Sequence, residues 1–223
     1  MTGRLGTMWN KKKALDLIHQ TGLIPIIRVD SSDTAMKVAD ALIEGGVRII
    51  EVTFSVPGAT DVVRKLTERL GDKVLVGTGT VLNGRMVDEA VAAGSEFIVS
   101  PGYSKELIDA TKKHSKPCIP GALTPTEILD AHNLGSDAVK VFPCGNLGGA
   151  NYIKAVRAPL PQIRLVPTGG VNLETARPLL EAGAFALGVG SAITDKKAIK
   201  DGRYEVITEN VKKFLDIVND VRK

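Results

Sequence analysis

The sequence contains few aromatic residues and no block of like charge, which argues against a nucleic-acid-binding protein. Aromatic residues make up 4% of the chain. The 29 basic and 25 acidic residues leave a net charge of +4, and the basic residues are scattered, without aromatic residues between them. A nucleic-acid surface usually needs both features together. The mild positive charge suits small anionic substrates instead.

Metal-binding and redox patterns are also missing from the sequence. Its two cysteines, Cys118 and Cys144, are far apart and fit no metal or redox spacing. The three histidines, His19, His114 and His132, are isolated from one another, which is more typical of helix surfaces than of ligands. We therefore expect reduced thiols, no metal site and no cofactor.

The chain has no long apolar segment either. No stretch is long and apolar enough to span a membrane. The region from Met1 to Asn10 lacks the apolar core of a signal peptide. These absences predict a cytoplasmic protein that has no membrane partner.

Short apolar runs, by contrast, are frequent and alternate with helical stretches along the whole chain. Such continuously apolar runs are typical of parallel strands covered on both faces. Glycine, with 23 residues, suits the many tight turns that this alternation needs. The predicted strands are Ile24–Val29, Arg48–Phe54, Val74–Val81, Glu96–Pro101, Cys118–Leu123, Asp137–Pro143, Arg164–Gly170 and Phe185–Ser191.

The stretches between the strands carry helix start signals. A serine and an aspartate precede the predicted helix Thr34–Glu44. The segment Thr124–Glu127 combines a hydroxyl cap, a proline in the first turn and a carboxylate three residues after the cap. Two further amphipathic helices are predicted, about Lys11–Gln20 before the first strand and Tyr204–Val221 at the carboxyl end.

This order of elements predicts an α/β fold of the (β/α)8 TIM-barrel type with an extra N-terminal helix. Residues 1–223 would form a single barrel domain, in which residues 1–21 are an N-terminal extension and helix. An open doubly wound sheet is the alternative. It is disfavoured because no Gly-x-Gly-x-x-Gly pattern follows the first predicted strand.

Lys140 is the most unusual residue of these predicted strands. It lies in the apolar run Asp137–Pro143, where an unpaired ammonium group would lose its hydration. Burial disfavours the charged form of an amine, and a neutral amine can form a Schiff base with a carbonyl substrate. Taken alone, the run slightly favours a lysine that reaches solvent from the strand end or pairs with a carboxylate. The rest of the chain reverses that preference.

Other polar residues fall at the same ends of the predicted strands. In a (β/α)8 barrel the carboxyl ends of the strands meet at one face, where active sites lie. Each residue alone has a structural explanation, such as strand propensity or a salt bridge. Their convergence on one end of the barrel favours a functional site, made of Arg28, Glu51, Thr80, Pro101, Lys140, Thr168 and Ser191.

Two glycine turns predict a phosphate site. Thr168–Asn172 follows the seventh predicted strand, and Gly188–Ser191 ends the eighth. Glycine lets the backbone approach an anion closely, and a following helix start adds a positive dipole. A phosphate site in the loops after strands seven and eight recurs in this fold. Turn geometry alone is the alternative explanation for these glycines.

Glu51 lies in another apolar strand, within the segment Ile49–Phe54. Burial would raise the pKa of this carboxyl, while a nearby Lys140 or Arg28 would lower it. A carboxylate beside a Schiff-base lysine can move protons, directly or through one water. A Glu51–Lys140 ion pair without a chemical role is the structural alternative.

The chain resembles the 2-keto-3-deoxy-6-phosphogluconate (KDPG) aldolase / 4-hydroxy-2-oxoglutarate aldolase family. The resemblance extends from Thr21 nearly to the carboxyl end, and its motifs occur in order on the expected strands. These motifs are Glu51–Thr53, Gly77–Val81, Phe97–Gly102, Ile119–Gly121, Lys140–Pro143, Pro167–Gly170 and Gly188–Ser191.

The resemblance implies a homotrimeric class I aldolase with a (β/α)8 barrel. In this reading Lys140 forms the Schiff base with pyruvate or the 2-keto acid, and Glu51 is the general acid/base. The pyruvate carboxylate would lie against Thr80 and Pro101. Thr168 would shape the site, and the phosphate of the aldehyde half would be held by Gly169, Gly170, Gly190 and Ser191.

One position departs from the pattern of the family. Many members have an arginine four residues after the glutamate, where this chain has Ser55. Some relatives combine a small hydroxyl residue there with an arginine at the end of the first strand, as Arg28 is here. We therefore expect Arg28 to supply the missing positive charge.

Three other functions are compatible with parts of this pattern. A phosphosugar epimerase, isomerase or synthase would share the glycine turns, but it would not need a buried strand lysine. A 2-keto-3-deoxy-6-phosphogalactonate aldolase would differ only in the stereochemistry that it accepts at C4. A barrel of this family could also serve as an assembly scaffold.

Overall fold

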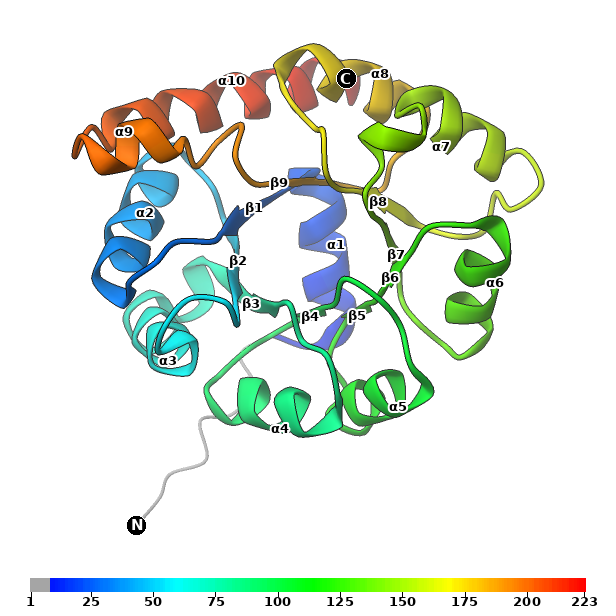
Figure 1. Cartoon of the computed structure of the whole chain (residues 1–223), viewed down its shortest axis with the longest axis horizontal. Helices are drawn as coiled ribbons and strands as arrows, with labels where there is room; N and C mark the ends of the chain where they lie inside the picture. The colour runs from blue at the N-terminus through cyan, green and yellow to red at the C-terminus, as the bar shows by residue number, and fades with distance from the viewer. Residues whose placement is uncertain (1–8) are drawn as a thin grey trace.

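The computed structural model describes residues 9–223, which form a closed ring of parallel strands surrounded by helices (Figure 1). The predicted N-terminal extension, as far as residue 8, lies outside the described residues. The strands are β1 (Leu23–Ile27), β2 (Ile49–Thr53), β3 (Leu75–Gly79), β4 (Ile98–Val99), β5 (Cys118–Ile119), β6 (Gly121–Ala122), β7 (Val139–Val141), β8 (Leu165–Pro167) and β9 (Leu187–Val189).

The predicted (β/α)8 barrel is confirmed, and β5 and β6 together form its fifth strand. They are separated only by Pro120, which has no backbone N–H to donate to a neighbouring strand. Hydrogen bonds join the strands in the order β5-β4-β3-β2-β1-β9 and, in a second group, β6-β7-β8. A parallel bridge between Thr168 and Gly188 connects β8 to β9 and closes the ring. All eight predicted strands are present, although each is shorter than predicted.

The helices alternate with the strands and pack around the outside of the barrel (Figure 1). Residues that the strands turn outward meet apolar helix residues, such as Val38 and Leu42 of α2 and Phe214 of α10, in one large core. The helices are α1 (Lys11–Thr21), α2 (Ser32–Glu44), α3 (Ala59–Leu70), α4 (Gly84–Ala92), α5 (Lys105–Lys113), α6 (Pro125–Asn133), α7 (Ala150–Arg157), α8 (Leu173–Glu181), α9 (Lys196–Lys200) and α10 (Glu205–Val221).

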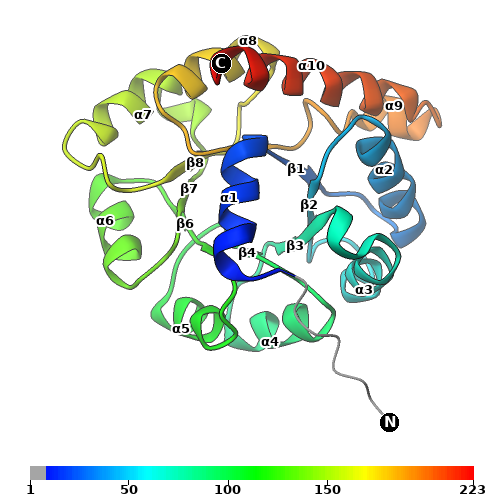
Figure 2. The same cartoon turned by 180° about the vertical axis from the view of Figure 1, so that it is seen from behind.

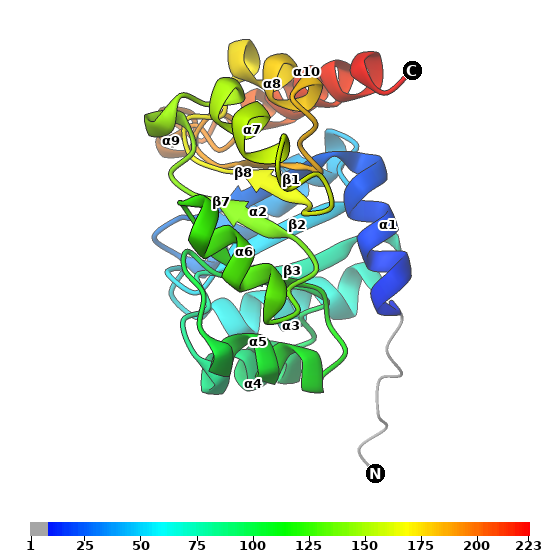
Figure 3. The same ribbon diagram turned by 90° about the vertical axis from the view of Figure 1, so that its right-hand side faces the viewer.

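Helix α1 covers the amino-terminal end of the barrel (Figures 2 and 3). Its apolar residues Ala14, Leu17 and Ile18 are buried in one cluster with Ile49 and Phe97 from the barrel. Because this end is filled, ligands can enter the barrel only from the carboxyl ends of the strands. Among residues 9–223, none of the helices has the length and hydropathy of a membrane span.

The predicted start of α6 is confirmed in detail. The Thr124 side chain accepts from the backbone N–H of Glu127, and the Glu127 carboxylate accepts from the backbone N–H of Thr124, which makes a reciprocal capping box. Three hydrogen bonds to this carboxylate, from the Thr124 and Leu123 N–H groups and the Thr124 hydroxyl, lower the pKa of Glu127. The cap fixes where the chain leaves the fifth strand.

A buried ion pair joins the strands near the filled end of the barrel. Lys116, which precedes β5, is hydrogen-bonded to Glu96, which precedes β4. Only 5% of Lys116 and 7% of Glu96 is exposed. Burial raises the pKa of the Glu96 carboxyl, and the hydrogen bond and charge of Lys116 counteract that rise. Each charge therefore depends on its partner for compensation.

Removing one partner of this pair should destabilise the protein strongly. Lys116→Met leaves the Glu96 carboxylate buried without its cation, so the free energy of unfolding should fall by about 3–5 kcal/mol. The double variant Glu96→Leu/Lys116→Met should recover most of that loss. Urea unfolding measures both. Lys105→Met breaks the exposed Lys105–Asp109 pair and is the control, with an expected loss of about 0.5 kcal/mol or less. Equal losses at the two lysines would contradict the interpretation.

Candidate active site

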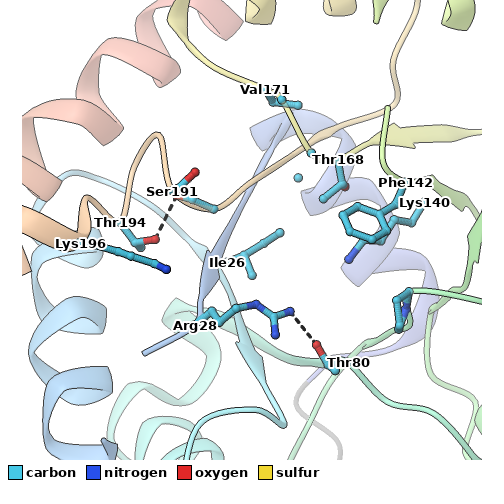
Figure 4. Close-up of a pocket in the computed structure, with 15 residues that line it drawn as sticks. Ile26, Arg28, Thr80, Lys140, Phe142, Thr168, Val171, Ser191, Thr194 and Lys196 are labelled. Carbon is cyan, nitrogen blue, oxygen red and sulfur yellow. Dashed lines mark hydrogen bonds between the residues drawn. The ribbon is translucent and has the colours of Figure 1, made fainter. Parts of the chain in front are cut away.

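A cavity of about 520 Å³ opens at the carboxyl ends of the barrel strands (Figure 4). All the predicted site residues except Glu51 line it, and they come from six of the eight barrel strands or the loops that follow them. The convergence expected from the sequence is therefore present. The predicted residues in the lining are Arg28, Thr80, Pro101, Lys140, Thr168, Gly169, Gly170, Gly190 and Ser191.

Lys140 presents its amine to this cavity from the middle of β7 (Figure 4). Only 6% of the residue is exposed, and its Nζ forms no ion pair or hydrogen bond with any residue of the described range 9–223. The Nζ lies 5.3 Å from the centroid of the Phe142 ring. A buried amine without a partner carboxylate is available to attack a carbonyl carbon.

Glu51 lies beside the cavity in β2 without lining it. It is 2% exposed, and its Oε1 has no hydrogen-bond partner. Burial raises the pKa of the carboxyl, and the charges of Lys140 and then Arg28 oppose that rise without cancelling it. The alternative of a direct Glu51–Lys140 ion pair is not realised in the described residues, where the nitrogen and oxygens lie more than 4.0 Å apart.

Gly79 makes the room that the Glu51 carboxyl occupies. A Cβ atom placed on Gly79 would lie 1.8 Å from Oε1 of Glu51, far inside van der Waals contact. The last residue of β3 therefore has to be glycine while the carboxyl keeps its present position. Gly79 belongs to the motif Gly77–Val81, which contributes to the family resemblance. The position of the Glu51 carboxyl gives a steric reason for this glycine.

Arg28 reaches from the end of β1 to Ser55, the position at which the family resemblance led us to expect a missing positive charge. Its guanidinium donates to Ser55 Oγ at 2.8 Å. It also donates to Thr80 Oγ1 at 2.9 Å (Figure 4). Ser55 Oγ also lies 2.8 Å from Thr53 Oγ1, which donates to the Ile27 carbonyl. The arginine that follows β1 is therefore anchored on residues that follow β2 and β3.

Thr80 has an unusual backbone conformation. Its φ is 58°, in the left-handed region that β-branched residues rarely adopt. Such a conformation costs about 1–3 kcal/mol and persists only where the surroundings hold it. Here the Thr80 hydroxyl accepts from Arg28 and the residue lines the cavity. The strain is located at the candidate site.

The two glycine turns leave a set of backbone N–H groups free. Gly169 and Gly170 have φ values of 84° and 76°, which suit glycine. The Gly190 carbonyl accepts from the Ile193 and Thr194 N–H groups and the Thr194 hydroxyl. The N–H groups of Gly169, Gly170, Gly190 and Ser191 donate to no acceptor within residues 9–223. Donors of this kind at a cavity wall can bind an anion.

Some lining residues could not be recognised from the sequence. Ile26 points inward from an ordinary apolar strand. Phe142 belongs to the motif Lys140–Pro143, but no role was predicted for it. Lys196 lies five residues after the second glycine turn, in a stretch with no motif. The residues missed in this way are Ile26, Phe142, Thr194 and Lys196, whereas Val171 and Gly188 were predicted only as parts of the glycine turns.

Cys144, close to Lys140 in the chain, is a structural residue in this arrangement. Both cysteines are buried and unpaired. Burial raises the pKa of the Cys144 thiol to about 11. Burial is also the main reason why the pKa of the Cys118 thiol is raised to about 12. A thiol is reactive as the thiolate, so neither cysteine is suited to act as a nucleophile near neutral pH.

Comparison with known proteins identifies the family of the chain. Residues 15–210 match the family described as "Aldolase: KDPG and KHG aldolase". The chain belongs to the KDPG/KHG aldolase family. It is 32% identical to the KHG/KDPG aldolase of Escherichia coli over 94% of this chain and 98% of that one. It is 34% identical to the 2-dehydro-3-deoxy-phosphogluconate aldolase of Treponema pallidum, over 91% and 96% of the two chains.

A solved structure of this aldolase family has the same fold. The KDPG aldolase of Legionella pneumophila is 32% identical to this chain, with a TM-score of 0.82 over 89% of this chain and 96% of that one. In that structure pyruvate was captured as a covalent carbinolamine intermediate. The family resemblance read from the sequence motifs is confirmed.

The buried carboxyl of Glu51 should make stability depend on pH. At low pH the carboxyl is neutral in both the folded and unfolded protein. As pH rises above the ordinary value of 4.5, the unfolded state ionises first, which destabilises the folded state until the pH has passed its raised pKa. Glu51→Gln should therefore be more stable than the wild type, by a margin that grows as pH rises above that ordinary value toward neutral pH.

Chemical denaturation across this pH range measures the margin. Glu209→Gln, which removes an exposed carboxylate from α10, is the matched control and should show no comparable growth. A margin for Glu51→Gln that shrinks with rising pH would contradict the raised pKa of Glu51.

Proposed function

We propose that this protein is a class I aldolase that reversibly cleaves KDPG to pyruvate and glyceraldehyde 3-phosphate, and that it also acts on 4-hydroxy-2-oxoglutarate. One observation carries the proposal. The amine of Lys140 is buried, has no partner within residues 9–223, and faces a cavity beside the buried carboxyl of Glu51. Phosphosugar isomerases and epimerases have no need of such an amine.

The reaction begins when the neutral amine of Lys140 attacks the C2 carbonyl of the keto acid. Loss of water gives an iminium ion, which accepts an electron pair. Glu51 takes the proton of the C4 hydroxyl, directly or through one water, and the C3–C4 bond breaks to leave an enamine. Glu51 then helps to return a proton to the enamine carbon, and water releases pyruvate from Lys140. The iminium polarises the substrate, so the scheme has no step for a metal ion.

The raised pKa of Glu51 suits this alternation between base and acid. A carboxyl with an ordinary pKa stays ionised at neutral pH and is a poor proton donor. Burial moves the pKa of Glu51 upward, while the charge of Lys140 limits the rise. Conversion of the Lys140 amine to an iminium puts a positive charge near Glu51, which favours the carboxylate when a base is needed.

The two ends of the cavity suit the two ends of the substrate. Arg28, with Thr80 and Pro101, would bind the pyruvate carboxylate. The free N–H groups of Gly169, Gly170, Gly190 and Ser191 would hold the phosphate, and Thr168 would shape the wall between the two ends. A Cβ on Gly188 would lie 2.2 Å from Thr168 Oγ1, so this glycine allows Thr168 to occupy its place.

The assembly and location of the protein are carried over from the family resemblance and the composition. We propose a homotrimer, which sedimentation would distinguish from a monomer or a larger particle. We further propose that the protein is cytoplasmic and contributes to sugar-acid breakdown in the Entner–Doudoroff pathway. A pure assembly scaffold is not favoured, because the cavity retains both the amine and the carboxyl.

Trapping with sodium borohydride tests the Schiff base directly. After treatment with pyruvate and borohydride, mass spectrometry should find one reduced pyruvate adduct, on Lys140. Lys140→Ala should carry no adduct and should lose at least about 10³-fold in kcat, because the covalent route is removed. Lys154→Ala, which removes an exposed lysine of α7, is the control and should be labelled like the wild type. Labelling that persists in Lys140→Ala would refute the assignment.

Because Arg28 contacts Ser55, we predict that an arginine at position 55 can replace the arginine at position 28 in substrate binding. Arg28→Ala should raise KM for the keto acid by about tenfold or more, because a charged hydrogen bond is lost. The double variant Arg28→Ala/Ser55→Arg should recover much of the loss, since it places the arginine where many relatives have it. Steady-state kinetics of the cleavage reaction measures both. A KM for Arg28→Ala close to that of the wild type would rule out the role.

A further inference from the structure

The cavity contains a third cationic side chain, which belongs to none of the motifs of the family. The residues that line the cavity include Arg28, Lys140 and Lys196, but no aspartate or glutamate. Lys140 is the proposed Schiff-base lysine, and Arg28 is held by Ser55 and Thr80. Lys196 is therefore the cation without an assigned partner or role.

Lys196 projects into the cavity from the phosphate side. It follows the loop that carries Ser191 and Thr194, and it lies across the cavity from Lys140 (Figure 4). The two glycine turns whose N–H groups are free line the same cavity as Lys196. The ammonium group thus lies on the wall where the end of the substrate remote from the keto group would be bound.

The neighbouring acid does not neutralise this lysine. The Asp195 side chain accepts from the backbone N–H of Ala198 at 2.6 Å and so caps α9. Within residues 9–223, Lys196 forms neither an ion pair nor a side-chain hydrogen bond. Its charge is therefore available to a ligand.

A second cavity, of about 770 Å³, extends this basic character outward. It shares Arg28 and Lys196 with the first cavity and is also lined by Lys200, with Asp30 as its one acidic residue. Lys196 thus lies between the outer cavity and the candidate active site. A cleft lined by one sign of charge raises the local concentration of oppositely charged substrate.

We propose that Lys196 is the specificity-determining residue that selects acceptor aldehydes and keto acids with a terminal dianion. A phosphate monoester carries about two negative charges near neutral pH. Backbone N–H groups and the Ser191 hydroxyl bind oxyanion oxygens but supply no full charge, and Lys196 provides one as a point charge. This inference rests on the proposed function for the identity of the substrate and adds the origin of its phosphate preference.

The kinetic test compares two substrates that differ only in the phosphate. For Lys196→Gln, kcat/KM for KDPG should fall about tenfold, the lower end expected for a charged hydrogen bond at an exposed side chain. The value for unphosphorylated 2-keto-3-deoxygluconate should not change, and Lys196→Arg should keep most of the preference. Equal effects on both substrates, or no effect on either, would overturn the proposal.

Lys197→Gln is the matched control. Lys197 is the next residue in the chain and is also exposed, but it does not line the cavity. Its substitution removes the same net charge from the same turn of α9 and should leave the ratio of the two kcat/KM values unchanged. An equal loss of preference in Lys197→Gln would show a general effect of net charge and would sink the specific role of Lys196.

A direct binding measurement separates this proposal from the proposed function. Inorganic phosphate is titrated into the protein and followed by ³¹P NMR, without any turnover. Lys196→Gln should bind phosphate about tenfold more weakly than the wild type or Lys197→Gln. Equal affinities would refute the role of Lys196 even if borohydride trapping succeeds. Weaker binding would support it even if no pyruvate adduct forms on Lys140.

Discussion

The burial of an amine and a carboxyl near one end of an apolar barrel is the constraint on which the site depends. Glu51 and Lys140 are each almost inaccessible to solvent, yet they do not form a direct ion pair in the described structure. Lys140 is close enough for its charge to oppose the rise in the pKa of the Glu51 carboxyl. A fully paired arrangement would be more stable but would leave neither group free to react. The separation keeps both an amine and a carboxyl available for chemistry.

The remaining parts of the barrel hold this arrangement in place. Closure of the ring between Thr168 and Gly188 brings the two glycine turns side by side, next to the strand that carries Lys140. Helix α1 fills the other end, so that substrate has one way in. Small residues on the strands are as important as the reactive ones, because Gly79 leaves the space that the Glu51 carboxyl needs.

Most of the fold and much of the site could be predicted from the sequence, for physical reasons. Parallel strands buried on both faces give apolar runs that are easily recognised, and strand order alone brings Arg28 and Thr80 to the same face. Lys196 could not be found this way, because an exposed lysine at the start of a short helix belongs to no apolar periodicity or motif. The separation between Glu51 and Lys140 was equally out of reach, since it depends on side-chain placement. Each strand is shorter than predicted because its bounds depend on which backbone groups form hydrogen bonds with the neighbouring strands. The apolar character of a run does not show where those hydrogen bonds end.

The left-handed backbone at Thr80 has a consequence for the divergence of such enzymes. Glycine or asparagine would adopt a φ of 58° at lower cost. Under random mutation and selection for thermal stability alone, threonine should therefore be replaced at this position. Only selection for binding would retain the hydroxyl that meets Arg28. The residue at position 80 can thus serve as a marker of whether a homologous barrel is still under selection for catalysis or has been released to other uses.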